Sequence, residues 1–219
     1  MMTMQSGKSV GPQAIGTQVD SVLTETSTPS GTRAILPFYR SAADPPLYHP
    51  EKARSRDEIE PELRGLINGL VTGKLNWPLM VYGGVGSGKT CAALALADAA
   101  GRGCLVQTLA ELTETVAACG RGDHYDPSGL KMNAERWWGE WWSKAPLVVI
   151  DELGLRGVVT DFQYEVLKRA LDLRHGQPAV YVSNLSPRDL AGVYDDRIVS
   201  RLCEGTVHKL TSTDRRLNK

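Results

Sequence analysis

The 219-residue sequence predicts an α/β fold in which a five-stranded parallel sheet lies between helices. Three observations lead to this prediction. Short apolar segments alternate with helix-like segments, a glycine-rich motif follows the first of the predicted strands, and a pair of carboxylates ends a later one. Because ligands of such sheets bind at the carboxyl ends of the strands, we expect the motif and the carboxylates at one edge.

The chain divides into three parts by composition. Residues 1–32 are rich in Ser, Thr, Gly and Gln and contain no aromatic residue, which predicts a disordered tail. Residues 33–56 carry a small apolar cluster before several prolines, and either a strap packed on the catalytic domain or a short partner-docking motif fits this pattern. Residues 57–219 are expected to form the catalytic domain.

The predicted elements of this domain follow from apolar spacing. Apolar residues three and four apart predict a helix over 56–71, which Gly73 ends. A T-x-x-Q capping box, Thr160 with Gln163, opens a helix over 161–174. Strands are predicted at 78–82, 104–107, 147–150, 179–182 and, more weakly, 206–210, and further helices at 91–100, 133–144 and 195–202.

The glycine-rich motif fits the pattern G-x-x-x-x-G-K-[ST] of a P-loop and lies between a predicted strand and a predicted helix. In this context the backbone amides and the helix N-terminus are expected to bind the phosphates of ATP. Lys89 would reach the β- and γ-phosphates, and the Thr90 hydroxyl would ligate Mg²⁺. The nucleotide-binding residues are predicted to be Gly83, Gly84, Val85, Gly86, Ser87, Gly88, Lys89, Thr90 and Cys91.

Asp151 and Glu152 follow the apolar segment 147–150 and are therefore expected beside the P-loop. We expect Asp151 to hold the Mg²⁺ shell and Glu152 to polarise the attacking water. Asn184 follows the segment 179–182 and is predicted to contact the γ-phosphate and the water, although Asn in this position also forms turns.

Two arginines lie one turn apart on the helix predicted at 195–202, namely Arg197 and Arg201. Arg201 is predicted to act as an arginine finger that completes the ATP site of a neighbouring subunit. The alternative is a solvated basic face paired with a carboxylate such as Asp196. Arg197 is the other candidate for the arginine finger.

Four tryptophans, Trp137, Trp138, Trp141 and Trp142, form one stripe on the helix predicted at 133–144. Packing in the core or between subunits is one interpretation. Stacking on the bases of single-stranded DNA, with flanking basic residues, is the other.

Composition narrows the class of protein only in part. The 25 Lys and Arg balance the 25 Asp and Glu, so the net charge neither favours nor excludes nucleic acid. No apolar segment approaches the roughly 18 residues needed to cross a bilayer, and no secretory signal is present. The four cysteines show no metal-site spacing, and a cytoplasmic protein without membrane contact is expected.

The motifs GGVGSGKT, LVVIDELG, YVSNLS and DDRIVSRLCEGT occur in an order that resembles the AAA+ ATPases of the DnaC-type helicase-loader group and the related IstB-type transposition helpers. The resemblance covers about residues 57–212. It implies a P-loop NTPase with an AAA+ core, with the helical lid absent or minimal because few residues follow Asn184. It also implies catalytic roles for Glu152, Asn184 and Arg201.

The resemblance further implies ATP and Mg²⁺ as cofactors, ATP-dependent homo-oligomers, single-stranded DNA binding and a partner protein. The favoured function is a DNA-replication ATPase that loads or remodels a replicative helicase. An IstB-like ATPase that serves a transposase is the alternative, and an ATP-gated DNA-binding module without turnover is an alternative of another class.

Overall fold

The computed structural model describes residues 65–66, 68–70, 72–100, 103–126, 128–155 and 158–211. The predicted tail (1–32) and the predicted strap or docking segment (33–56) lie outside the described residues. So does most of the helix predicted at 56–71, in which 65–66 and 68–70 are helical. The described residues all fall within the predicted catalytic domain.

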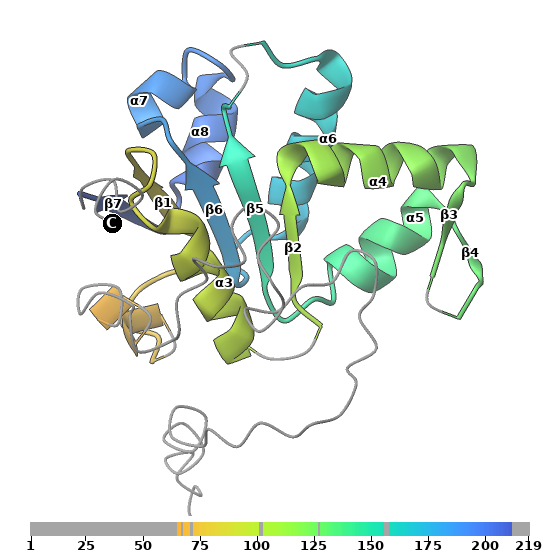
Figure 1. Ribbon diagram of the computed structural model, residues 1–219, viewed down its shortest axis with the longest axis horizontal. Helices are drawn as coiled ribbons and strands as arrows, with labels where there is room; N and C mark the ends of the chain where they lie inside the picture. The colour runs from red at the N-terminus through yellow and green to blue at the C-terminus, as the bar shows by residue number, and fades with distance from the viewer. Residues whose placement is uncertain are drawn as a thin grey trace, which may run out of the picture. The chain divides into compact units, whose positions relative to one another are not determined.

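A five-stranded parallel sheet forms the centre of this domain, as the sequence predicts (Figure 1). Every predicted strand is present, with bounds close to those expected. In chain order the strands are β1 (Leu79–Gly83), β2 (Leu105–Thr108), β5 (Val148–Leu153), β6 (Ala179–Ser183) and β7 (Thr206–Leu210). Their order across the sheet is β2-β5-β6-β1-β7, so β6 lies between the strand of the P-loop and the strand that carries the carboxylates.

The strands are connected mainly by helices. These are α3 (Lys89–Ala100), α4 (Leu109–Arg121), α5 (Ala134–Arg136), η3 (Trp137–Trp142, a π-helix), α6 (Asp161–Leu173), α7 (Pro187–Leu190) and α8 (Asp196–Leu202). A short antiparallel hairpin, β3 (His124–Tyr125) with β4 (Lys131–Met132), follows α4. Capping boxes at Thr108 with Glu111 and at Thr160 with Gln163 satisfy the free amides that begin α4 and α6. None of the described helices is long and apolar enough to cross a membrane.

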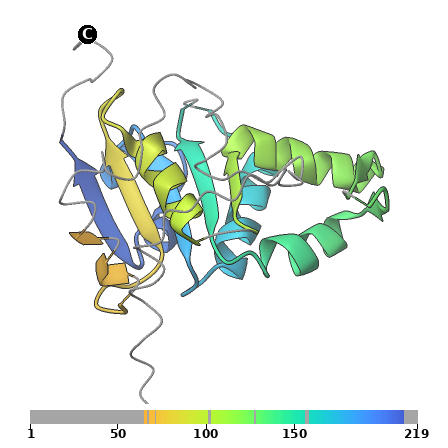
Figure 2. The same ribbon diagram turned by 60° about the horizontal axis from the view of Figure 1, so that its bottom comes forward.

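Helices cover both faces of the sheet because successive strand residues point to opposite sides (Figures 1 and 2). Leu79, Val149 and Val180 pack in one cluster with residues of α3. Ile150 and Tyr181 belong to the other cluster, which contains residues of α4, η3, α6 and α8. The near-continuous apolar sequence of each strand follows from this double burial.

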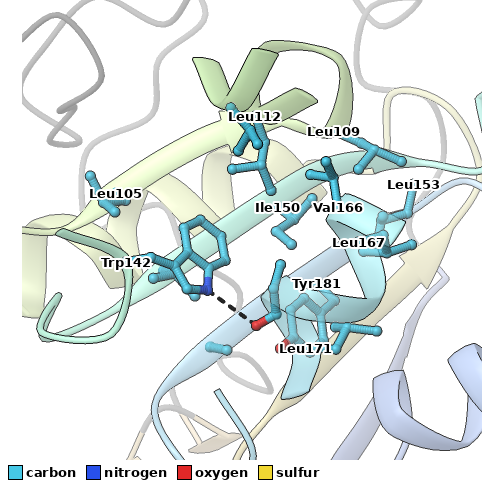
Figure 3. Close-up of a cluster of buried hydrophobic side chains, with 14 of the residues drawn as sticks. Leu105, Leu109, Leu112, Trp142, Ile150, Leu153, Val166, Leu167, Leu171 and Tyr181 are labelled. Carbon is cyan, nitrogen blue, oxygen red and sulfur yellow. Dashed lines mark hydrogen bonds between the residues drawn. The ribbon is translucent and has the colours of Figure 1, made fainter. Parts of the chain in front are cut away.

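The tryptophan stripe lies in the second cluster, where Figure 3 shows Trp142. Trp137, Trp138 and Trp142 are buried, and Trp142 Nε1 donates a hydrogen bond of 3.1 Å to the carbonyl of Ala170. The packing interpretation is therefore confirmed for these three side chains, which are not available for stacking on bases. Trp141 is half-buried.

A buried arginine joins the end of this stripe to the start of β6. Arg174 is 1% exposed and donates to the carbonyls of Trp142, Ser143, Ala145 (2.9 Å) and Pro178. Burial lowers the pKa of its guanidinium. By bonding these backbone carbonyls, the side chain stabilises the turn from η3 into the following strand.

Candidate nucleotide-binding site

The P-loop connects β1 to α3, as predicted. β1 ends at Gly83, where an added Cβ would collide with the carbonyl of Leu210 on the neighbouring strand β7. Gly88, just before α3, has a φ of 95°, a conformation that residues with a side chain rarely adopt. Both glycines are therefore required by the path of the backbone.

Lys89 is the first residue of α3, and its side chain turns back into the loop. Its Nζ donates to the carbonyl oxygens of Gly83 (2.8 Å) and Gly84 (2.6 Å) and to Oγ of Ser87 (3.2 Å). The side chain is 6% exposed. A positive charge is thereby held at the centre of a loop whose helix also contributes the positive end of its dipole.

Thr90 and Asp151 meet across the sheet edge, 61 residues apart in the chain. The Thr90 hydroxyl donates a 2.6 Å hydrogen bond to Oδ2 of Asp151. Burial raises the pKa of Asp151, against the hydrogen bond from Thr90 and the charge of Lys89, which act to lower it. A hydroxyl and a carboxylate side by side are oxygen ligands of the kind that Mg²⁺ prefers, so the residues fit the predicted metal.

A β-bulge sets the position of Glu152. Ile150 is paired with Tyr181 and Leu153 with Ser183, so two residues of β5 lie opposite one residue of β6. Glu152 has a φ of 60°, and its amide donates to Oδ1 of Asp151 (2.7 Å). In a bulge of this kind the extra residue points its side chain in a direction different from that of a regular strand residue.

Glu152 lines a surface hollow together with residues of α4, of α6, of the segment after β5 and of the segment before α8. Its wall includes Leu109, Gly154, Leu155, Val158, Gln163 and Tyr194. Burial raises the pKa of the Glu152 carboxyl, and the negative charges of Asp151 and Glu111 raise it further. A half-exposed carboxylate with a raised pKa is a suitable proton acceptor from water.

Asn184 directly follows β6 and is exposed. Because β6 lies between β1 and β5, the end of this strand lies between the P-loop and the carboxylates. The preceding residue, Ser183, is buried and donates from Oγ to the carbonyl of Leu153 (2.6 Å). The predicted site segments of β1, β5 and β6 are therefore brought to one edge.

Arg201 lies on α8 and makes contacts within its own subunit. Its side chain is 40% exposed and forms ion pairs of 3.5 Å with Asp172 and with Glu204, while Nη1 lies 3.1 Å from Nδ1 of His175. The carboxylates beside it are therefore not Asp196, the residue named in the sequence-based alternative. Arg197, one turn earlier, is exposed.

No protein-family model and no curated protein matches the sequence. Solved structures do resemble it. The DnaI structure superposes with a TM-score of 0.55 at 19% identity, covering 74% of this chain and 90% of that one. DnaA from Aquifex aeolicus bound to AMPPCP gives 0.54 at 18% identity over 68% of this chain. The replication initiator DnaA bound to AMPPCP and single-stranded DNA gives 0.55 at 18% over 69%.

The chain has the fold of an AAA+ core. It spans 44% of each of these two DnaA chains. At such identities the likeness concerns the fold, and the chemistry rests on the side chains of this chain.

Sequence reasoning missed three features of this candidate site. The bulge at Asp151 and Glu152 depends on the register with β6 and has no local signature. Ser183 and Tyr194, which contact the backbone after Glu152, also went unrecognised, because a Ser at a strand end and a Tyr in a loop are common. The T-x-x-E pattern of Thr108 to Glu111 was a visible signal for α4 and for the third carboxylate near the site.

Proposed function

We propose that this chain is an ATPase that binds ATP with Mg²⁺ and hydrolyses it. The observation that carries this proposal is the contact of Thr90 with Asp151 at 2.6 Å, next to a loop whose centre holds Lys89. A strand end that places a carboxylate against the threonine of a predicted phosphate-binding loop supports a nucleoside triphosphate as the ligand.

Each predicted residue would have a defined part in hydrolysis. Lys89 and the P-loop amides would bind and orient the phosphates, and Thr90 with Asp151 would hold Mg²⁺, which when bound neutralises charge on the phosphate oxygens. Glu152 would accept a proton from the attacking water. Asn184 would orient that water, and Arg201 would supply positive charge to the site of a neighbouring subunit.

We propose further that the ATPase acts in DNA replication, where it loads or remodels a replicative helicase and binds single-stranded DNA as an ATP-dependent oligomer. The resemblance of its motifs to helicase loaders supports this, as does its structural likeness to DnaI and DnaA. Single-stranded DNA is present in one of the similar DnaA structures. Since Trp137, Trp138 and Trp142 are buried, the DNA contact would use other residues.

The test combines turnover with partner capture. Purified protein should release phosphate from ATP over many turnovers, Lys89→Ala should lose nucleotide binding, and Glu152→Gln should bind ATP but hydrolyse it only at a low residual rate. ATP binding without any turnover in the unmodified protein would instead indicate the ATP-gated DNA-binding module. Capture on immobilised chain with ATP should retain a replicative helicase, whereas retention of a transposase would favour the IstB-like alternative.

A further inference from the structure

The backbone that follows Glu152 is held in an unusual conformation. Glu152 has a φ of 60°, and Gly154, two residues later, has a φ of 73°. Among the described residues, Glu152 is the one non-glycine residue with a positive φ. Such conformations persist where the surrounding structure fixes them, and they often occur at functional sites.

Two side chains hold the peptide group between Leu153 and Gly154, one at each end. Ser183 Oγ donates to the carbonyl of Leu153 (2.6 Å), and the amide of Gly154 donates to the hydroxyl of Tyr194 (3.1 Å). Both polar groups of one peptide plane are thereby bonded to side chains. Rotation of this peptide would break both bonds.

Close packing holds the same peptide in place. A Cβ at Gly154 would lie 2.7 Å from Cδ2 of Leu190 and 2.9 Å from Cδ1 of Leu185, so the backbone lies directly against the segment after β6. Burial raises the pKa of the Tyr194 phenol, which therefore stays protonated at neutral pH. The hydroxyl is thus a constant acceptor for the amide of Gly154.

The two side chains come from the two other segments of the predicted site. Ser183 immediately precedes Asn184, and its Oγ also accepts from the amide of Leu185 (3.0 Å). Tyr194 immediately precedes Asp195, whose carboxylate caps α8 by accepting from the amide of Ile198 (2.8 Å). One peptide plane therefore connects the turn of Glu152 to the Asn184 segment and to the helix that carries the arginines.

We propose that Tyr194, together with Ser183, is a positioning residue for Glu152. It fixes the 153–154 peptide and thereby keeps the Glu152 carboxylate in a constant orientation relative to Asn184 and to α8. The inference rests on the proposed ATPase function and deepens it. A merely structural hydrogen bond would affect stability but not the turnover of bound ATP, and the two possibilities are separable.

The experiment compares Tyr194→Phe with a matched control, Tyr164→Phe. Each change removes one hydroxyl, and the Tyr164 hydroxyl donates to Oδ2 of Asp195 (2.7 Å), next to Tyr194, without contacting the 153–154 peptide. We expect kcat of Tyr194→Phe to fall roughly ten- to a hundredfold with the Kd for ATP within about twofold of the unmodified value. Tyr164→Phe should keep the unmodified kcat.

A second readout links the effect to Glu152. In a Glu152→Gln background, adding Tyr194→Phe should lower the residual rate no further, because residues that act as a unit are not additive. Ser183→Ala removes the bond at the other end of the peptide and should reproduce the loss of kcat. This second variant decides the matter if Tyr194→Phe does not fold.

The outcomes that contradict the inference are distinct from those that contradict the ATPase proposal. If the unmodified protein hydrolyses ATP and Tyr194→Phe does so equally fast, the inference is wrong and the ATPase proposal stands. Equal losses in Tyr194→Phe and Tyr164→Phe, or a full further loss in the Glu152→Gln background, would also overturn it. Absence of turnover in the unmodified protein would overturn both.

Discussion

The Thr90 hydroxyl donates to Oδ2 of Asp151 over 2.6 Å and so joins the start of α3 to the end of β5. We expect Thr90→Val, which has nearly the same shape but no hydroxyl, to lose the Mg²⁺-dependent part of nucleotide binding. Thr90→Ser keeps the hydroxyl and is the matched control. Titration of a fluorescent ATP analogue with and without Mg²⁺ measures the difference, and equal Mg²⁺ dependence in both variants would contradict the metal assignment.

The pH dependence of hydrolysis should report the environment of Glu152. Its pKa is raised by burial and by the charges of Asp151 and Glu111, so the base form is lost as the pH falls through a value above the ordinary one. Glu111→Gln removes one negative charge while keeping an oxygen that can accept from the Thr108 amide. The acid limb of kcat should therefore move to lower pH.

Glu114→Gln is the control for this shift, because Glu114 is exposed on the same helix. It should leave the acid limb in place. An acid limb that does not move in Glu111→Gln would show that the group titrating in the rate is not Glu152.

Arg201 is predicted to act on a neighbouring subunit. Arg201→Ala should bind ATP nearly normally yet fail to hydrolyse it, since the missing charge belongs to the transition state in the adjacent site. Its ion pairs with Asp172 and Glu204 are exposed, so its loss should cost stability no more than about 1 kcal/mol. Steady-state ATPase and a thermal melt measure both effects.

Mixing experiments separate Arg201 from Arg197. Subunits with Arg201→Ala combined with Glu152→Gln subunits should recover some activity, because one interface again pairs an intact Glu152 with an intact Arg201. The same mixture made with Arg197→Ala is the comparison that shows which arginine is the finger. Hydrolysis that Arg201→Ala leaves unaffected at concentrations where the protein is monomeric would exclude both the finger and the obligatory assembly.

Arg174 offers a prediction about stability alone. Arg174→Met keeps an apolar stem but removes the donors to four backbone carbonyls, two of which are those of Ala145 and Pro178. We expect the free energy of unfolding to fall by about 3 kcal/mol, measured in urea. Arg169→Ala, which removes a guanidinium 5.3 Å from the Trp138 ring at the surface, should cost only about 0.5–1 kcal/mol.

The sheet and the placement of the main candidate residues at its edge were predictable because their signals are local. An apolar run predicts a doubly buried strand, and a glycine pattern between a strand and a helix predicts a phosphate loop. The conformation of η3 was not predictable, since an α-helix and a π-helix share the same apolar stripe. Arg174 gave no signal either, because arginine is usually exposed and its burial here depends on carbonyls from two distant turns.

The bulge in β5 also distinguishes the residues of this strand that build the sheet from Glu152, the residue proposed to act in hydrolysis. Between Ile150 and Leu153 the strand has one residue more than its partner β6, and both Ile150 and Leu153 face the same cluster as α4 and α6. If Glu152 were deleted, Ile150 and Leu153 would be two residues apart and would still point to the same face of the sheet. In terms of the sheet, Glu152 is an extra residue, so the core beneath it does not depend on the carboxylate.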